Sequence, residues 1–186
     1  MHFSTFVIIG RHDDPESAVA RTLQPFDEES EVAPYRDYLD SADISRMAEH
    51  YGIPATDLPA LAENMEDWRG RIGGVDRRGL YAITTCNPSG KWDWYEIGGR
   101  WNGVIPRSRG NIISARALCR SPRLRACLPY YLVTPDGDWR ECEGVPAFGM
   151  PQSEGDKQAE ARWFATVRQV LTKFIDHRVV CVDVHS

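Results

Sequence analysis

The chain has 186 residues, of which 42% are hydrophobic, and its formal net charge is −5. This length fits one domain with a core of its own, so we expect a single domain over residues 1–186. The acidic balance argues against binding of bulk nucleic acid, because phosphates attract basic surfaces. No run of residues approaches the roughly 18 apolar positions that a membrane-spanning helix requires. We therefore expect no membrane partner.

The charges are unevenly distributed along the chain. Residues 97–135 contain seven Arg and neither Asp nor Glu, whereas residues 12–40 are rich in acids. These Arg either pair with acidic segments and face water, or form a local basic face that could bind another protein. The seven are Arg100, Arg107, Arg109, Arg116, Arg120, Arg123 and Arg125.

The cysteine pattern indicates free thiols. The five Cys are an odd number, and no pair has the spacing of a CxxC motif. Structural zinc sites need ligand spacings that this chain lacks, so we expect neither a metal nor another cofactor. Reduced thiols are typical of cytoplasmic proteins, and a cytoplasmic location is the expectation here.

The first half of the chain predicts one strand and a helical insertion. Residues 3–9 are apolar enough for a buried strand, which Gly10 ends. Residues 11–35 are acidic and contain several Pro, so we expect an irregular arm with room for one helical turn at 18–22. Helices are expected over 41–51 and 56–69, the second with an apolar stripe. Together they form an insertion over 41–70. The stripe consists of Leu58, Leu61, Met65 and Trp68.

The second half predicts two hairpins, a long helix and a last strand. The hairpins are expected over 80–97 and 130–143, the second turning at Pro135-Asp136-Gly137. Residues 159–174 have the wide apolar face of an amphipathic helix. Residues 179–184 read as a strand. The fold class is therefore α+β, with a mostly antiparallel sheet in which both terminal strands are neighbours.

Residues 92–101, WDWYEIGGRW, form the most distinctive stretch of the chain. Such aromatics often build a hairpin core, because cross-strand aromatic pairs stabilise sheets. The alternative is a ligand site in which aromatic rings form a floor and an Arg holds an anionic group by stacking and a two-pronged hydrogen bond. The residues expected to bind ligand are Trp92, Trp94, Tyr95, Arg100, Trp101 and Trp139.

Sequence motifs of common enzyme families are missing: there is no GxSxG, P-loop, dinucleotide-binding GxGxxG or HExxH pattern. One constellation could support acid–base chemistry, namely Asp93, Asp183 and His185 beside Arg100. These groups would converge if the last strand joined the aromatic stretch in one sheet, where Asp can orient an imidazole. The simpler interpretation is that Asp183 and His185 end a strand in water.

The stretch 92–101 resembles a signature of uncharacterised proteins that are common in tailed phages and prophages. Residues 6–10 with 25–28, residues 134–139 with Gly149-Met150, and residues 182–185 are similar to other parts of that family. Val184 stands where the family pattern leads us to expect Cys, which argues against thiol chemistry there. The resemblance implies a phage origin and the cytoplasm of a host cell, and it carries no catalytic residues.

Two main functions follow from these patterns. The first is an accessory binding protein that holds a small planar, anionic, nucleotide-like molecule, or a host protein, to counter host defence. The second is an enzyme that acts on a nucleotide or nucleotide-sugar through Asp and His. A protein–protein inhibitor that uses the Arg-rich face over 100–125 is a further alternative. The sequence does not predict an oligomeric state.

Overall fold

The computed structural model describes residues 1–66, 72–143 and 154–186. Its contacts divide the chain into two compact units. The larger unit consists of Met1–Ser30 and Ser89–Ser186, and the smaller one is Glu31–Pro88. The insertion expected over 41–70 falls within the residue range of the smaller unit, and its last residues, 67–70, lie outside the described part of the chain. Among the described helices, none has both the length and the apolar character needed to cross a membrane.

The larger unit is built on one mixed sheet. Within the described residues its strand order is β5-β9-β1-β7-β8, with β6 also paired to β9. Only the β1–β7 pair is parallel among these ladders, so the predicted, mostly antiparallel α+β fold is confirmed. The strands are β1 (His2–Ile9), β5 (Trp94–Ile97), β6 (Ile112–Ser114), β7 (Tyr131–Val133), β8 (Trp139–Glu141) and β9 (Arg178–His185).

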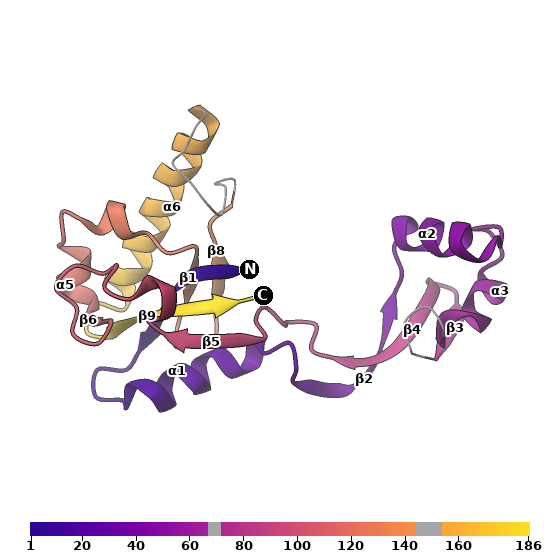
Figure 1. Ribbon diagram of the computed structural model, residues 1–186, viewed down its shortest axis with the longest axis horizontal. Coiled ribbons are helices and arrows are strands. Elements are labelled where there is room, and N and C mark those ends of the chain that lie inside the picture. The colour runs from indigo at the N-terminus through magenta and orange to yellow at the C-terminus, as the bar shows by residue number, and fades with distance from the viewer. Residues whose placement is uncertain (67–71, 144–153) are drawn as a thin grey trace. The chain divides into compact units, whose positions relative to one another are not determined.

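The two terminal strands are neighbours, as predicted. β1 and β9 pair antiparallel along their whole length, from His2 opposite His185 to Ile9 opposite Arg178. Figure 1 shows the two termini beside each other at the same end of this ladder. β9 also pairs with β5 and β6 on its other side. The C-terminal strand is therefore interior to the sheet.

Each face of the sheet is covered by a separate apolar cluster. On one face Phe6, Ile8 and Cys181 pack with α6 (Glu154–Lys173) and α5 (Ala115–Cys119), which confirms the predicted C-terminal helix. On the other face Val180, Val182 and Val184 of β9 pack with α1 (Pro15–Leu23) and Phe26. Burial on both faces explains why both terminal strands are almost uniformly apolar.

The predicted irregular arm over 11–35 was wrong in two places. Residues 15–23 form α1, because the Asp14 side chain accepts a hydrogen bond from the Ser17 backbone N–H (3.0 Å) and Pro15 occupies the first turn. The buried Val19 and Leu23 then hold the helix on the sheet. Further along, Glu31–Tyr38 forms strand β2.

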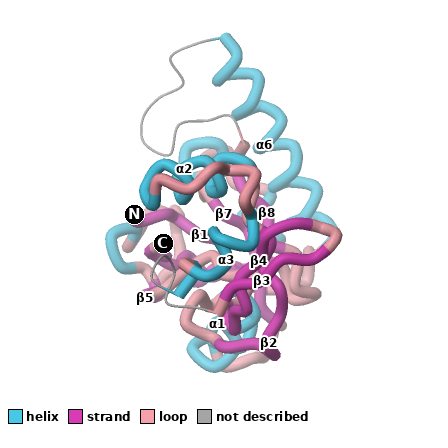
Figure 2. The backbone as a smooth tube through the Cα atoms, turned by 90° about the vertical axis from the view of Figure 1, so that its right-hand side faces the viewer, coloured by secondary structure: helices cyan, strands magenta, loops and turns pink. Residues whose placement is uncertain are grey.

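The smaller unit is a three-stranded sheet with order β2-β4-β3. Helices α2 (Ser41–Tyr51) and α3 (Leu58–Glu63) pack beside β3 (Gly73–Asp76) and β4 (Gly79–Cys86), as Figure 2 shows. The core between them contains Met47, Leu61, Met65 and Leu80. Gly52 ends α2 with a φ of 66°, as its position in the sequence predicts. The predicted end of the second helix, with Trp68, Arg69 and Gly70, lies outside the described residues.

The hairpin expected over 80–97 is not formed. β4 pairs with β2 and β3 in the smaller unit, whereas β5 pairs with β9 in the larger one. The turn chemistry of residues 87–90 therefore belongs to a connection between units. The second hairpin is confirmed: β7 and β8 pair antiparallel, and the Gly137 N–H donates to the Thr134 carbonyl (3.0 Å) in its turn.

None of the five cysteines, all of which lie in the described part of the chain, forms a disulfide. Burial raises the pKa of Cys142 to about 11 and that of Cys181 to about 12, which keeps both protonated at neutral pH. Cys86 is exposed. We expect a thiol reagent at pH 8 to modify Cys86 within seconds and the buried thiols far more slowly, whereas titration in denaturant without reductant should count close to five. A count near one or three would contradict this expectation.

Candidate functional site

The paired glycines of the aromatic stretch are required by close packing. Gly98 and Gly99 have φ angles of 80° and 45°, which side-chain-bearing residues rarely adopt. A Cβ atom on Gly99 would lie 2.5 Å from the Cβ atom of Asp183, and one on Gly98 would lie 2.2 Å from the Asn111 amide nitrogen. The chain therefore turns directly against Asp183, and this contact brings the aromatic stretch to the last strand.

Asp183 is a buried carboxylate that joins three segments. Its side chain is 1% exposed. One oxygen accepts the Arg100 backbone N–H (3.0 Å), and the other lies 3.0 Å from Nδ1 of His2. A buried carboxylate is costly unless such donors surround it. Asp183 thus positions both the turn at Gly99–Trp101 and the imidazole of His2.

A second carboxylate–imidazole pair lies beside the first. Nδ1 of His185 is 2.7 Å from a carboxylate oxygen of Asp93, and this hydrogen bond lowers the pKa of Asp93. The Asp93 backbone N–H also donates to the His185 carbonyl (3.1 Å). The sheet therefore brings together Asp93, Asp183 and His185 from distant parts of the sequence.

Three adjacent strands each contribute one residue to the row that contains these imidazoles. His2 lies opposite His185, and His185 lies opposite Trp94. Because directly paired residues share a face, all three belong to the face that carries Phe6 and Cys181 further along the ladders. The imidazoles of His2 and His185 have ring centroids 5.0 Å apart, and the Trp94 ring lies 5.9 Å from His2. The face of the sheet that carries Phe6 and Cys181 therefore has two imidazoles at the end near the chain termini.

This row borders a shallow hollow of about 340 Å³, the histidine hollow, lined by His2, Glu29, Asp93, Trp94 and His185. Trp94 is 46% exposed, which is unusual for an indole that could have packed in a core. A carboxylate only accepts hydrogen bonds, so the Nδ1 atoms of His2 and His185 carry the donated protons. No described residue bonds to either Nε2 atom. Two oriented imidazoles therefore have a ring nitrogen available for proton exchange.

The structure divides the other predicted ligand-binding aromatics between the two faces of the sheet. Trp92 and Tyr95 pack edge to face in the cluster around Val182 and Val184, with ring centroids 5.1 Å apart. The Trp92 ring N–H donates to the Leu23 carbonyl (2.9 Å). Trp101 packs against the opposite cluster. These three rings serve the core, whereas Trp94 and the exposed Arg100 remain accessible.

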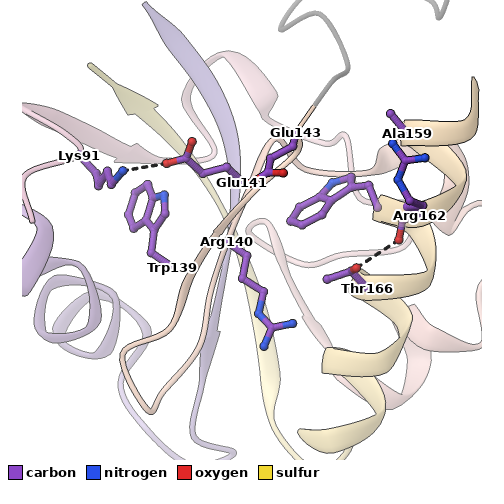
Figure 3. A pocket seen from close by; sticks show the side chains of 9 residues that line it. Lys91, Trp139, Arg140, Glu141, Glu143, Ala159, Arg162 and Thr166 are labelled. Carbon is purple, nitrogen blue, oxygen red and sulfur yellow. Dashed lines mark hydrogen bonds and ion pairs between the residues drawn. The ribbon is translucent and has the colours of Figure 1, made fainter. Parts of the chain in front are cut away.

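Trp139 lines a different and larger hollow of about 550 Å³ between β8 and α6. Figure 3 shows its ring beside the ion pair of Lys91 and Glu141, whose charged atoms are 3.0 Å apart. Arg140, Arg162 and Glu143 also line this hollow, and Arg140 pairs with Asp138 at 2.7 Å. This hollow shares no lining residue with the histidine hollow and contains none of the predicted acid–base groups. The positions of the acid–base groups therefore favour the histidine hollow as the candidate functional site.

Comparisons of the chain with protein-family models, with curated proteins and with solved structures find no match. Among the described residues, no group of three or more His, Cys, Asp or Glu is placed to hold a metal ion. The resemblance to phage proteins stays a prediction.

Sequence reasoning missed His2. It stands before the apolar run that predicts the first strand, so it carries no motif of its own. The expected pairing of the terminal strands contained the necessary information, since an antiparallel ladder that begins at residue 2 and ends at residue 185 places these two histidines opposite each other. Glu29 carried no comparable signal.

Proposed function

We propose that the protein binds a small, planar, nucleotide-like molecule in the histidine hollow. The observation that carries this proposal is the row of Trp94, His185 and His2, in which an exposed indole stands beside two carboxylate-oriented imidazoles. An indole face stacks on a nucleobase, and imidazole Nε2 atoms hydrogen-bond to ribose or phosphate oxygens. Arg100 does not line this hollow, but its side chain is exposed and its backbone N–H donates to Asp183, the residue that also binds His2; we propose that it supplies a cation for the anionic group.

A protonated imidazole beside Asp93 makes that pair neutral, so Glu29 is then the lining carboxylate that an anionic ligand would still meet. Binding of this kind would suit a phage accessory protein that sequesters a nucleotide signal of the host. It needs no turnover.

An acid–base enzyme is the second candidate, favoured by the paired imidazoles. A neutral imidazole can take a proton from a hydroxyl group or a water through Nε2, while its protonated neighbour gives one to a leaving oxygen. The fixed Nδ1–H bonds to Asp93 and Asp183 hold both rings in the tautomer that this exchange requires. The substrate would be a nucleotide or a nucleotide-sugar.

Mass spectrometry of small molecules released by heat from the protein, purified from host lysate, tests both candidates. We expect wild type to release a nucleotide-like compound, and Trp94→Leu, His185→Gln and Arg100→Ala each to retain it at least tenfold more weakly. Loss of one charged hydrogen bond costs about 1.5–3 kcal/mol, or roughly ten- to hundredfold in affinity. Arg100→Lys should recover little, because it lacks the planar fork.

Glu96→Gln is the matched control, because Glu96 is exposed and lies on the same strand; it should retain the compound at the wild-type level. An intact compound after prolonged incubation supports binding, and a converted one supports the enzyme. If Arg100→Ala unfolds several degrees earlier and still retains the compound, Arg100 is structural. If wild type releases no such compound, the proposal fails.

A further inference from the structure

A third hollow, of about 560 Å³, is lined entirely by residues of the Arg-rich segment. Its polar lining consists of Arg107, Arg120, Arg123 and Ser121. Because residues 97–135 contain no Asp or Glu, this segment supplies no carboxylate to the hollow, and no other acid of the described residues lines it. The apolar part of the lining consists of Pro106, Ile113, Ala117 and Pro122. We call this place the arginine hollow.

The three guanidinium groups have no ionic partner among the described residues. Their neighbours in the sequence do: Arg116 is 2.7 Å from Asp176, and Arg125 is 3.7 Å from Glu160. Three positive side chains that line one hollow with no carboxylate beside them repel one another, even on a protein with a net charge of −5. This arrangement becomes favourable when an anion occupies the hollow.

The backbone at Arg107 supports the same conclusion. Arg107 has a φ of 65°, one of two positive values outside glycine among the described residues. It follows Pro106 in a turn that the Ser108 N–H closes onto the Ile105 carbonyl (3.3 Å). The third position of a turn with a positive φ normally holds Gly, and another residue there costs on the order of 1 kcal/mol. A side chain kept at that cost indicates a role that Gly could not perform.

We propose that the arginine hollow binds an anion with two or more linked phosphoryl groups. Three Arg can balance such a charge, and guanidinium groups hold phosphate oxygens by two-pronged hydrogen bonds. The hollow has the size of a typical small-molecule site. Its apolar wall at Ile113 and Ala117 can also contact the organic part of a nucleoside polyphosphate. This site is independent of the histidine hollow, with which it shares no residue.

Isothermal titration calorimetry of the full chain with tripolyphosphate in 50 mM salt tests the proposal. We expect saturable one-to-one binding, at least tenfold weaker for Arg120→Gln and for Arg107→Gly. The glycine variant is the more diagnostic of the two, because Gly suits the positive φ. Its unfolding temperature should equal or exceed that of wild type while its affinity falls. A purely structural Arg107 would show no loss of affinity.

Arg116→Gln is the matched control, because Arg116 lies in α5, which ends just before Arg120, but pairs with Asp176 and does not line the hollow. It should bind within about twofold of wild type. An arm with adenosine triphosphate separates two sources of the anion: tighter binding than tripolyphosphate indicates a nucleotide, and equal binding indicates that the phosphates alone are recognised. No saturable binding by wild type, or equal weakening in all three variants, overturns the proposal.

Discussion

Truncation after Ile175 should abolish folding of the larger unit. The deletion removes β9, which pairs with β1 on one side and with β5 and β6 on the other. Residues 179–184 are all buried, and the four valines among them each contribute about 1.5–3 kcal/mol through burial. Their sum of roughly 6–12 kcal/mol is comparable to the whole stability of a typical domain. The remaining apolar β1 would also expose an unpaired edge and aggregate.

Soluble yield and tryptophan fluorescence measure this outcome, because five of the six Trp lie in the larger unit. The truncated chain should be largely insoluble, and any soluble fraction should show the red-shifted emission of exposed indoles. Deletion of Ser186 alone is the control and should leave both readings unchanged. A soluble truncated chain with cooperative unfolding and wild-type emission would show that β9 is dispensable.

The elements that the sequence predicted correctly are those whose own pattern decides their structure. Both terminal strands are apolar runs buried on two faces, and α6 has a continuous apolar stripe. The turn at Pro135-Asp136-Gly137 acts through the conformations of its own residues. In these places local chemistry and tertiary packing agree, so a single sequence is sufficient.

The incorrect predictions concern partners that are distant in the sequence. Residues 80–86 and 94–97 each have strand character, and the turn between them suggested that they pair. Each instead pairs elsewhere: β4 lies between β2 and β3 in the smaller unit, and β5 lies beside β9 in the larger one. Local pattern identifies a strand but does not select its neighbour. The same limit applied to α1, whose burial depends on a sheet that its own residues do not predict.

The candidate site was predictable in part. Asp93, Asp183 and His185 come together because β5 joins β9, which the sequence reasoning treated as a condition and the structure fulfils. The aromatic stretch, in contrast, had suggested that its rings line one ligand site together. Alternation along β5 sends Tyr95 into the core and leaves Trp94 outside. Tyr95 is half-buried because α1 and Phe26 pack on its face of the sheet. No residue within 92–101 determines that these elements pack there.

Asp183→Ala should destabilise the larger unit and disorder the histidine hollow. The change removes the acceptor for the Arg100 backbone N–H and for Nδ1 of His2, both at 3.0 Å, within a nearly dry environment. Leaving buried donors unpaired costs about 2–4 kcal/mol in total, which corresponds to a fall in unfolding temperature of roughly 5–15 °C for a protein of this size. Thermal unfolding followed by circular dichroism measures the shift.

Two companion variants separate the charge from the shape of Asp183. Asp183→Asn keeps the volume and one accepting oxygen, so it should retain the Arg100 N–H bond and lose about half as much stability as the alanine variant. Glu96→Gln changes a carboxylate on the paired strand, directly opposite Asp183 but exposed, and should shift unfolding by less than about 2 °C. If Asp183→Ala unfolds at the wild-type temperature, the buried carboxylate does not organise the turn at Gly99. The close approach of Gly99 to Asp183 would then be a consequence of packing elsewhere in the sheet, and the histidine hollow would lose its structural basis.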